Sequence, residues 1–246
     1  MLNISRLPVC DQCLSSIRPI GDGLCAICGE RLLGPYPFPA DGEIRCPLCR
    51  RLEPPYVKAA AYGSYEGGLR ELIHMLKYDG IRPAANVLGR MLAEAIATLP
   101  LHFTQVPVVI VPVPLHQRKR HQRGFNQAEL IARAALKLEP SAQFELKSAL
   151  DRTRETQSQI GLSRHQRREN LRGAFVVTAP GEIRGREVLL VDDVFTTGTT
   201  VSECARVLRR AGAATVYVAT VARTLKLEAQ SARLEPEAAM TMAAAS

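Results

Sequence analysis

Two adjacent carboxylates and a hydroxyl-rich loop are the residues of this sequence best suited to chemistry. Asp192 and Asp193 come directly after the apolar run 188–191. The loop positions that can bind an anion are Thr196, Thr197, Gly198, Thr199 and Thr200. Carboxylates accept hydrogen bonds from neutral hydroxyls, whereas threonine hydroxyls and closely approaching backbone amides bind phosphate oxygens. The combination predicts a site for a sugar phosphate, with its diol on the aspartates and its phosphate on the loop.

Two common nucleotide-binding loops are excluded at this position. The loop contains no lysine, so it is not the G-x-x-x-x-G-K-[ST] loop of nucleotide hydrolases, and it lacks the G-x-G-x-x-G spacing of dinucleotide sites. The run 188–191 has the length and β-branching of a buried strand, and residues 201–211 have helical spacing. Asp192 and Asp193 are therefore predicted at the carboxyl end of a strand, where open α/β sheets bind ligands. The alternative is a plain strand-to-helix turn with a carboxylate cap.

A basic segment follows another predicted strand, 106–113. Four cations and two histidines occur within residues 116–123, with no acidic residue among them. We expect this segment at the same sheet edge as Asp192, because it also follows the carboxyl end of a strand. Arginine and lysine pair with phosphate oxygens, so Arg118, Lys119 and Arg123 are predicted to bind a pyrophosphate group. The alternative is a solvated basic loop.

A second polar segment spans residues 151–175. It is rich in arginine and poor in residues that could join a core. Segments of this length inside a compact domain are usually functional or disordered. We expect a functional segment over the site, and a surface excursion is the competing interpretation.

Six of the seven cysteines occur before residue 50, in three C-x-x-C pairs. In order along the chain, the pairs are Cys10/Cys13, Cys25/Cys28 and Cys46/Cys49. Without a secretion signal, such pairs indicate metal binding rather than disulfides. The second and third pairs have the spacing of a four-thiolate zinc site, which fills the coordination shell of zinc and predicts a structural role. The first pair supplies alternative zinc ligands, and a redox dithiol is the competing interpretation.

Composition and charge limit the function less than the motifs do. The chain has 246 residues and a formal net charge of +8, which suits either nucleic acid or a polyphosphate substrate. No stretch reaches the roughly 20 apolar residues that span a bilayer. The N-terminus lacks the basic region and apolar core of a secretory signal. We therefore expect a cytoplasmic protein without membrane insertion.

Three parts are expected along the chain: a cysteine-rich zinc-binding module over 1–55, an α/β domain over 56–225 and a C-terminal tail over 226–246. The α/β assignment rests on strands that alternate with helices, which indicates a parallel sheet. Expected strands are 56–65, 106–113, 144–150, 174–178, 188–191 and 215–221. Expected helices are 69–76, 83–99, 127–138 and 201–211.

From Cys10 to Arg223 the chain resembles the ComF (competence protein F) family of phosphoribosyltransferase-like proteins. The C-x-x-C pairs, the loop 188–200 and five further motifs carry this resemblance. The five motifs are Leu76-Lys77-Tyr78, Val111–Leu115, Arg123–Ala128, Gln159–Arg164 and Asn170–Phe175. The resemblance implies the parallel sheet of type I phosphoribosyltransferases, with helices on both faces, and a small N-terminal zinc module.

The resemblance also implies a substrate, phosphoribosyl pyrophosphate (PRPP). Asp192 and Asp193 would be catalytic and hold the ribose 2- and 3-hydroxyls, while Thr196–Thr200 would hold the 5-phosphate. Mg²⁺ would bridge the pyrophosphate and ribose oxygens, with few protein ligands. Residues 151–172 would form a mobile hood that excludes water from the reacting sugar. The motifs do not identify the acceptor of the phosphoribosyl group.

Three classes of function follow. The first is a glycosyltransferase-class enzyme that transfers a phosphoribosyl group from PRPP, with a link to DNA uptake in natural transformation. The second is a non-catalytic competence factor that senses PRPP or binds single-stranded DNA. The third is an adaptor for proteins of the competence machinery. Measuring PRPP binding with and without Mg²⁺ is the first test, because it separates functions that use PRPP from DNA binding and from an adaptor role.

Overall fold

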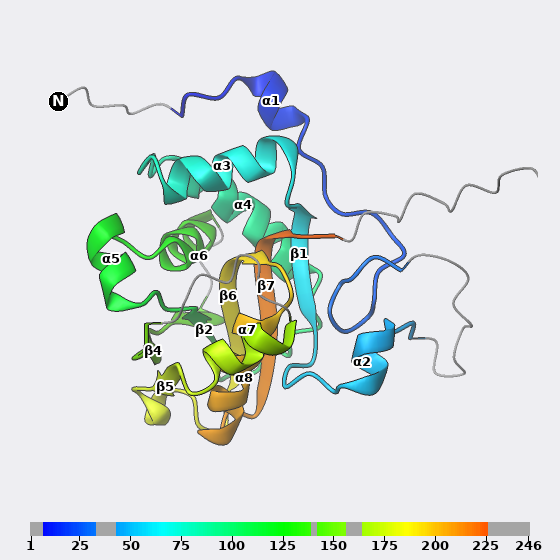
Figure 1. The fold of residues 1–246 in the computed structure, drawn as a ribbon, viewed down its shortest axis with the longest axis vertical. Coiled ribbons are helices and arrows are strands. Elements are labelled where there is room, and N and C mark those ends of the chain that lie inside the picture. The colour runs from blue at the N-terminus through cyan, green and yellow to red at the C-terminus, as the bar shows by residue number, and fades with distance from the viewer. Residues whose placement is uncertain (1–6, 33–42, 139–141, 156–163, 226–246) are drawn as a thin grey trace, which may run out of the picture.

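The computed structural model describes residues 7–32, 43–138, 142–155 and 164–225 of the chain. In this part, five parallel strands form the central sheet, in the order β1-β7-β6-β2-β3 (Figure 1). The strands are β1 (Ala59–Ser64), β2 (Val108–Pro112), β3 (Phe144–Leu146), β6 (Glu187–Phe195) and β7 (Thr215–Arg223). The central strands are continuous apolar runs because helices bury both of their faces.

Helices cover the sheet on both sides, which confirms the predicted fold class. On one face, α4 (Ala84–Ala97) and α6 (Gln127–Leu138) pack on the strands, and α3 (Gly67–Lys77) packs on α4. On the other face, α8 (Thr199–Arg210) packs on β6 and β7, and α7 (Arg164–Leu171) packs on α8. No helix among the described residues is both long enough and apolar enough to cross a membrane.

Strand side chains alternate between the two buried clusters, as the period of a strand requires. Val111 and Leu190 belong to the cluster under α8, whereas Ile110 and Leu189 belong to the cluster under α4 and α6. The sheet is therefore a fixed platform that is buried on both faces, and its carboxyl edge is the place where polar side chains can meet a ligand.

The connections change direction between β2 and β6, which are neighbours in the sheet. After β2 the chain passes through α6 to β3, whereas after β6 it passes through α8 to β7 on the other side. Such a reversal leaves a crevice outside the carboxyl ends of the two strands. The segments that follow β2 and β6 both carry predicted site residues.

The predicted strand 174–178 exists as β5 (Phe175–Val177), but its predicted place in the main sheet is wrong. It pairs antiparallel with β4 (Leu150–Arg152) in a separate two-stranded sheet. A short apolar run shows that a strand forms, but it does not show which partner takes the hydrogen bonds. The 3₁₀ helix η1 (Pro180–Glu182) then leads into β6.

The basic segment after β2 forms a helix, α5 (Gln117–Arg123), that apolar periodicity cannot predict because the segment has no apolar residue. Glutamine, arginine and lysine favour helix. Gly124 ends it in the left-handed conformation, with φ of 77°. The cations predicted to bind pyrophosphate are therefore held on a helical turn.

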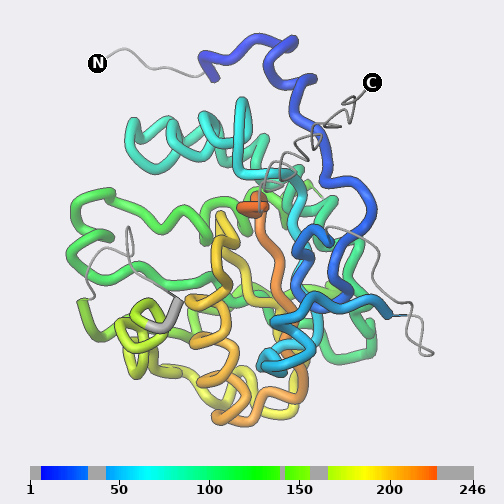
Figure 2. The backbone as a smooth tube through the Cα atoms, turned by 45° about the vertical axis from the view of Figure 1, so that its right-hand side comes forward, coloured from blue at the N-terminus to red at the C-terminus, as the bar shows by residue number. Residues whose placement is uncertain are grey.

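The N-terminal segment lies along the sheet edge formed by β1 (Figure 2). It contains the short helices α1 (Asp11–Ser15) and α2 (Pro47–Arg51). The amide of Ala59 in β1 donates to the carbonyl of Ile27 at 2.7 Å, so the cysteine region is attached to the sheet by a backbone hydrogen bond. The predicted tail 226–246 and the motif residues 159–163 lie outside the described residues.

Candidate functional site

Asp192 and Asp193 lie inside β6, near its carboxyl end, rather than after the strand. Asp193 is buried, with 4% of its surface exposed, and Asp192 is half-buried. Each carboxylate accepts a hydrogen bond from the next backbone amide: Asp192 from Asp193 N at 2.9 Å and Asp193 from Val194 N at 2.8 Å. Burial, and then the charge of Asp193, raise the pKa of Asp192 well above its ordinary value.

Lys77, in the last turn of α3, forms an ion pair with Asp193. Burial lowers the pKa of Lys77, but the attraction of Asp193 and its hydrogen bond outweigh this effect, so that the pKa is raised. Lys77 is not among the site residues predicted from the sequence. A signal was present, because Lys77 lies four residues after Ile73 and eight after Leu69, on the buried face of α3.

The phosphate loop follows β6 and leads directly into α8. Gly198 is the N-cap residue of α8 and has φ of 72°, in the left-handed region. Since glycine has no side chain to accept from the first helical amides, these donors remain open to an anion. The hydroxyls of Thr197 and Thr199 lie 2.8 Å apart, so both are directed toward the same space.

Helix α5 brings positive charge to the same sheet edge. The amide of Val113, directly after β2, donates to the carbonyl of Val191 in β6 at 2.8 Å. This contact shows that the basic segment starts beside the carboxyl-terminal part of β6, which contains the two aspartates. Asn126 fixes the far end of the segment, because its side chain donates to Val113 O at 3.0 Å and accepts from Ala128 N.

Lys119 is the centre of a cluster of cations. Burial lowers its pKa, and the charges of Arg152, Arg123 and Lys77 lower it further. Arg123 also contacts Gln127 Oε1 at 2.5 Å and lies over the ring of Tyr78 at 5.7 Å. Cations from three separate elements thus repel one another, and Glu155 offsets only part of this repulsion, so an anion bound among them would be favourable.

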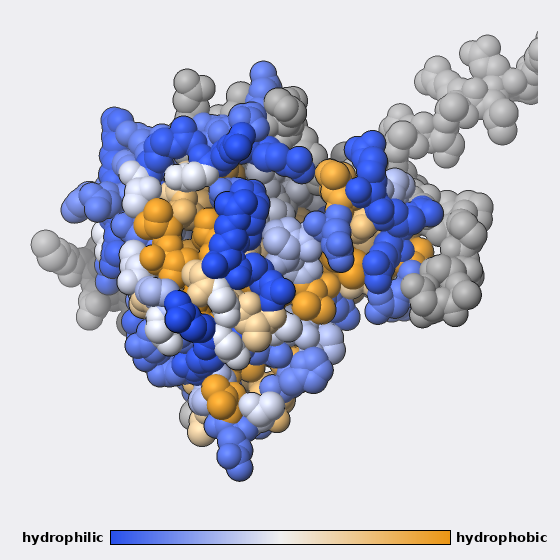
Figure 3. All heavy atoms as spheres, turned by 90° about the horizontal axis from the view of Figure 1, so that it is seen from below, coloured by the Kyte–Doolittle hydropathy of each residue, from blue (hydrophilic) through white to orange (hydrophobic). Residues whose placement is uncertain are grey.

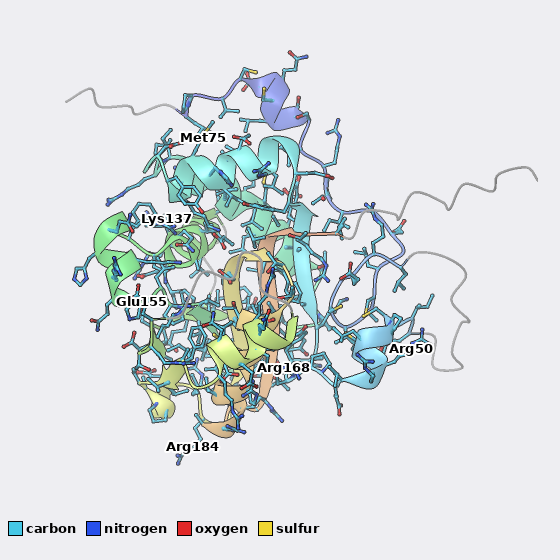
Figure 4. The ribbon with its side chains drawn as sticks, viewed as in Figure 1. Arg50, Met75, Lys137, Glu155, Arg168 and Arg184 are labelled. Atoms are coloured by element: carbon cyan, nitrogen blue, oxygen red, sulfur yellow. The ribbon has the colours of Figure 1, made fainter. Side chains whose placement is uncertain are left out.

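Arg118 and Arg152 depart from the sequence-based expectation in opposite ways. The side chain of Arg118 is 77% exposed and pairs at 3.3 Å with Glu155, which Figure 4 shows next to α5. Arg152, in β4, was not predicted as a site residue. Burial lowers the pKa of Arg152, and the negative charge of the nearby Asp192 opposes part of this effect. Its guanidinium stacks over Phe175 at 5.5 Å. The cross-strand pair in β4 and β5 therefore positions a cation that no local motif marks.

The second and third C-x-x-C pairs come together in a buried cluster. The sulfur atoms of Cys25, Cys28, Cys46 and Cys49 all lie within 4.8 Å of one another. Cys28 Sγ and Cys46 Sγ are 3.7 Å apart. Ligands of tetrahedral zinc at about 2.3 Å lie about 3.8 Å from each other, so this spacing fits a metal with four thiolate ligands. The cluster could hold a metal such as zinc.

Backbone amides support these sulfurs. Cys46 N donates to Cys25 Sγ at 3.2 Å, and Cys49 N donates to Cys46 Sγ at 3.5 Å. Hydrogen bonds from Cys28 and Cys49 lower the pKa of the Cys25 thiol, and the hydrogen bond to Cys25 raises the pKa of Cys28 to about 12. Without a metal, the cluster therefore shares protons among its sulfurs, whereas a divalent cation favours the ionised form of all four.

The remaining cysteines lie apart from this cluster. Cys10 and Cys13 are exposed at α1, and the set of sulfurs that the structure brings together within the described residues does not include them. Cys204 is buried in α8, where burial raises the pKa of its thiol well above the ordinary value.

Comparisons with known proteins identify relatives of this chain. A family model described as phosphoribosyl transferase domain matches residues 88–241. The DNA utilization protein YhgH of Escherichia coli O157:H7 is 37% identical over 211 residues, which cover 82% of this chain and 91% of that protein. Competence protein F of Haemophilus influenzae is 31% identical over 222 residues, covering 87% of this chain and 96% of that protein.

One solved structure, of the allosteric regulatory enzyme of purine biosynthesis, overlaps this chain with a TM-score of 0.35 and 24% identity. The overlap covers 56% of this chain and 25% of that enzyme.

Proposed function

Since this chain belongs to the ComF family of phosphoribosyltransferase-like proteins, we propose that it binds PRPP and, with Mg²⁺, transfers the phosphoribosyl group to an acceptor. One observation carries the proposal: a carboxylate pair, a threonine loop and a cation cluster meet at the carboxyl ends of β2 and β6. A ribose that carries a phosphate at one end and a pyrophosphate at the other has complementary groups in the same arrangement.

Each part of PRPP is assigned to one element. The 5-phosphate binds the amino end of α8, at Thr196–Thr200. The ribose hydroxyls bind Asp192 and Asp193 at the end of β6. The pyrophosphate lies against α5, where Lys119 and Arg123 face the cluster and Arg118 lies at its outer side. The substrate would then span the crevice where the sheet connections reverse.

The residues also suit the chemistry of transfer. A nucleophile on the acceptor forms a bond to C1, and the pyrophosphate leaves with the electron pair of the C1–O bond. The carboxylate of Asp192 favours the positive charge that grows on the ribosyl centre. Lys119, Arg123 and Arg152 favour the negative charge that grows on the leaving group. We assign no residue as the base that takes the acceptor's proton.

The site fits a magnesium ion that enters with its substrate. Mg²⁺ prefers oxygen ligands and keeps several waters, and it is usually held by one or two carboxylates together with phosphates. Asp193 already pairs with Lys77, which leaves Asp192 as the nearest carboxylate for this purpose. When bound, the ion supplies positive charge between the pyrophosphate oxygens.

We further propose that Cys25, Cys28, Cys46 and Cys49 hold one structural zinc ion. Four thiolates complete a tetrahedral shell and leave no position for substrate. The short segments around these cysteines bury few side chains of their own, so a metal would supply much of the free energy that orders them. Elemental analysis should find one zinc ion per chain, and Cys25→Ser should lose it while Cys10→Ser keeps it.

Calorimetry with PRPP tests the proposed substrate. Wild-type protein should bind PRPP more tightly with Mg²⁺ than without it, and the double variant Asp192→Asn/Asp193→Asn should lose binding while remaining folded. Lys119→Met should weaken binding by about tenfold or more, because a charge-assisted hydrogen bond contributes about 1.5–3 kcal/mol. Arg133→Gln is the matched control, since Arg133 is a cation on α6 that pairs with Glu129 at 2.8 Å outside the cluster. Unchanged affinity in the double variant would contradict the assignment.

The names of the relatives favour a second candidate function. DNA utilization protein and competence protein F suggest a role in DNA uptake, and this chain carries a net charge of +8. The alternative is therefore a non-catalytic factor that senses PRPP or binds single-stranded DNA. Two results together would make this alternative replace the first proposal. Lys119→Met would weaken the binding of single-stranded DNA but not of PRPP, and the slope of DNA affinity against salt concentration would become shallower by about one unit.

A further inference from the structure

Arg223 is a buried cation between the four-cysteine cluster and the phosphate loop. It is the last residue of β7, it stands opposite Phe195 in the register of β6 and β7, and only 3% of its surface is exposed. Lone guanidinium groups are rarely buried to this extent, because the loss of hydration must be offset by fixed partners. The partners of Arg223 come from two regions that are far apart in the sequence.

Toward the cysteines, the guanidinium of Arg223 contacts the turn that contains Cys28. Arg223 Nη1 donates to the carbonyl of Cys28, and Nη2 lies 3.9 Å from Cys28 Sγ. Nη2 also pairs with Glu30 Oε2 at 2.9 Å. A zinc ion with four thiolates carries a net charge of −2, so an occupied site would hold this guanidinium both by charge and by hydrogen bonds.

Toward the phosphate loop, the same guanidinium lies over an aromatic ring. Its central carbon is 4.4 Å from the centroid of the Phe195 ring. The same ring fills the space beside Gly198, because a Cβ added to Gly198 would lie only 2.6 Å from Phe195 Cζ. The backbone joins the same residues, since Thr224 N donates to Phe195 O at 3.0 Å.

The cysteine cluster and the phosphate loop also share one cavity. It has a volume of about 1010 Å³, and Cys28, Arg223, Phe195, Thr197 and Thr199 all contribute to its wall. Figure 3 shows the molecule from below, with apolar patches among hydrophilic side chains where the smaller cysteine-containing lobe meets the main body. Arg223 and Phe195 therefore form a continuous series of contacts from Cys28 to the loop.

We propose that Arg223 is a positioning residue that couples metal occupancy of the four-cysteine site to the phosphate loop. An occupied site fixes Arg223, which fixes the Phe195 ring and thereby holds the Gly198 turn open for a phosphate group. The inference rests on the proposed function, in that the loop is taken to receive the 5-phosphate of PRPP. Because coupling between two ligands is reciprocal, PRPP must then tighten the binding of zinc by the same factor by which zinc tightens PRPP.

The reciprocal effect can be measured on zinc-loaded protein, so that a folded metal-free form is not needed. Zinc transfer to a competing chelator is followed with and without saturating PRPP and Mg²⁺, in wild type, Arg223→Gln and Glu30→Gln. Glu30→Gln is the milder variant, since it removes one partner of the guanidinium and leaves Arg223 in place. Arg186→Gln is the matched control, because Arg186 is a half-buried arginine that pairs with Glu145 at 2.8 Å at the opposite end of β6.

In wild type and in Arg186→Gln, PRPP should raise the protein's affinity for zinc, measured against the chelator, by about fivefold or more. The factor should fall below about twofold in Arg223→Gln and take an intermediate value in Glu30→Gln. Equal factors in wild type and Arg223→Gln would overturn the proposal, and so would wild-type protein whose zinc transfer ignores PRPP although calorimetry shows that PRPP binds.

Hydrogen exchange separates failure of this inference from failure of the proposed function. If wild-type protein does not bind PRPP, the proposed function fails, and the coupling is then read from the amides of 197–201 during zinc transfer. These amides should lose protection in wild type but show no metal-dependent change in Arg223→Gln, while the amides of 109–111 in β2 stay protected in both. Loop protection that does not depend on zinc in wild type overturns the coupling.

Discussion

At the scale of single residues, the arrangement of Asp192 and Asp193 shows how two neighbouring carboxylates are kept in one strand. Successive strand residues point to opposite faces of a sheet. Asp193 faces α3 and pairs with Lys77, whereas Asp192 faces the side of α8, where its charge acts on Arg152 and Cys204. Among the described residues, Asp193 forms an ion pair with Lys77, whereas Asp192 has no ion-pair partner. The negative charge of Asp192 is therefore the less stabilised of the two, and it is the charge that the proposed chemistry uses.

Replacing Lys77 should destabilise the protein through Asp193. Lys77→Met leaves a buried carboxylate without its cation, which costs about 3 kcal/mol in the free energy of unfolding. Adding Asp193→Asn should recover most of this loss, because the buried charge is then gone. Urea unfolding at pH 7 of both single variants and the double variant measures the coupling between the two residues. Strictly additive effects would show that the ion pair does not contribute.

Replacing Asp192 should stabilise the protein in a pH-dependent way. Its pKa is raised in the folded state, so between the ordinary value of 3.8 and the raised value the folded protein binds more protons than the unfolded chain. The free energy of unfolding therefore falls as pH rises through this window, and each unit of pKa corresponds to about 1.4 kcal/mol. Asp192→Asn removes this loss of stability at higher pH.

The melting temperature from pH 4 to pH 8 checks this expectation. Asp192→Asn should melt above wild type at neutral pH, and the difference should shrink toward pH 4. Asp79→Asn serves as the control, because Asp79 is exposed and lies after the end of α3. A difference between Asp192→Asn and wild type that is the same at every pH would mean that the carboxylate charge is not its cause.

At the scale of elements, the proposed site depends on how strands end. β6 continues through both aspartates to Phe195, and the chain then needs only the left-handed Gly198 to turn into α8. β2 ends at Pro112, and α5 returns its cations toward the same edge. β4 contributes Arg152 from outside the main sheet. The cation cluster is therefore a product of strand pairing, and no single motif contains it.

The Gly198 turn should tolerate no side chain. Gly198→Ala combines a positive φ of 72° with a Cβ that would lie 2.6 Å from Phe195 Cζ. The backbone strain costs about 1 kcal/mol, and displacement of the ring adds to it. We expect PRPP affinity, measured by calorimetry, to fall by about tenfold or more, since the loop and the ring must both move.

A second glycine separates backbone strain from the effect of the ring. Gly185 also has a positive φ, of 71°, but a Cβ there would meet no atom within 4 Å. Gly185→Ala should lose about 1 kcal/mol of stability and bind PRPP as the wild type does. If Gly185→Ala lowered the affinity for PRPP as much as Gly198→Ala does, a general loss of stability would explain both results.

At the scale of the whole molecule, the cysteine region and the sheet share one core. The four clustered cysteines belong to the same buried cluster as Leu190, Val201 and Val218 on the α8 face of the sheet. Arg223 adds a buried polar connection between them. The boundary predicted near residue 55 therefore separates two segments of the sequence that pack against each other, and it stays a prediction about folding units.

Heating should reveal this shared core as a single transition. We expect one calorimetric peak for the zinc-loaded chain, and we expect removal of zinc to lower its midpoint by roughly 10 °C, because the binding free energy of a structural metal is folding free energy. Two separate peaks, of which only one moves when zinc is removed, would show that residues 1–55 unfold by themselves.

Local patterns along the chain were enough to predict several parts of this protein. Apolar runs predicted β2 and β6, and helical spacing predicted α6 with its observed bounds. These patterns arise because the apolar side chains of a buried face recur at regular intervals along the sequence. The motifs led to the family, and the resemblance to ComF proteins is confirmed. The C-x-x-C spacing pointed to the four cysteines that the structure brings together, although it left Cys10 and Cys13 as alternatives.

The tertiary fold sets which distant residues meet. It paired β5 with β4 instead of the main sheet, brought Lys77 to Asp193 and Arg152 toward Asp192, and buried Arg223 between Cys28 and Phe195. A lone lysine or arginine leaves no periodic or motif signal that names its partner, since the energy of a buried charge depends on groups supplied by other elements. Charge pairing across elements is therefore fixed by packing, whereas strands, helices and ligand motifs can be read along the chain.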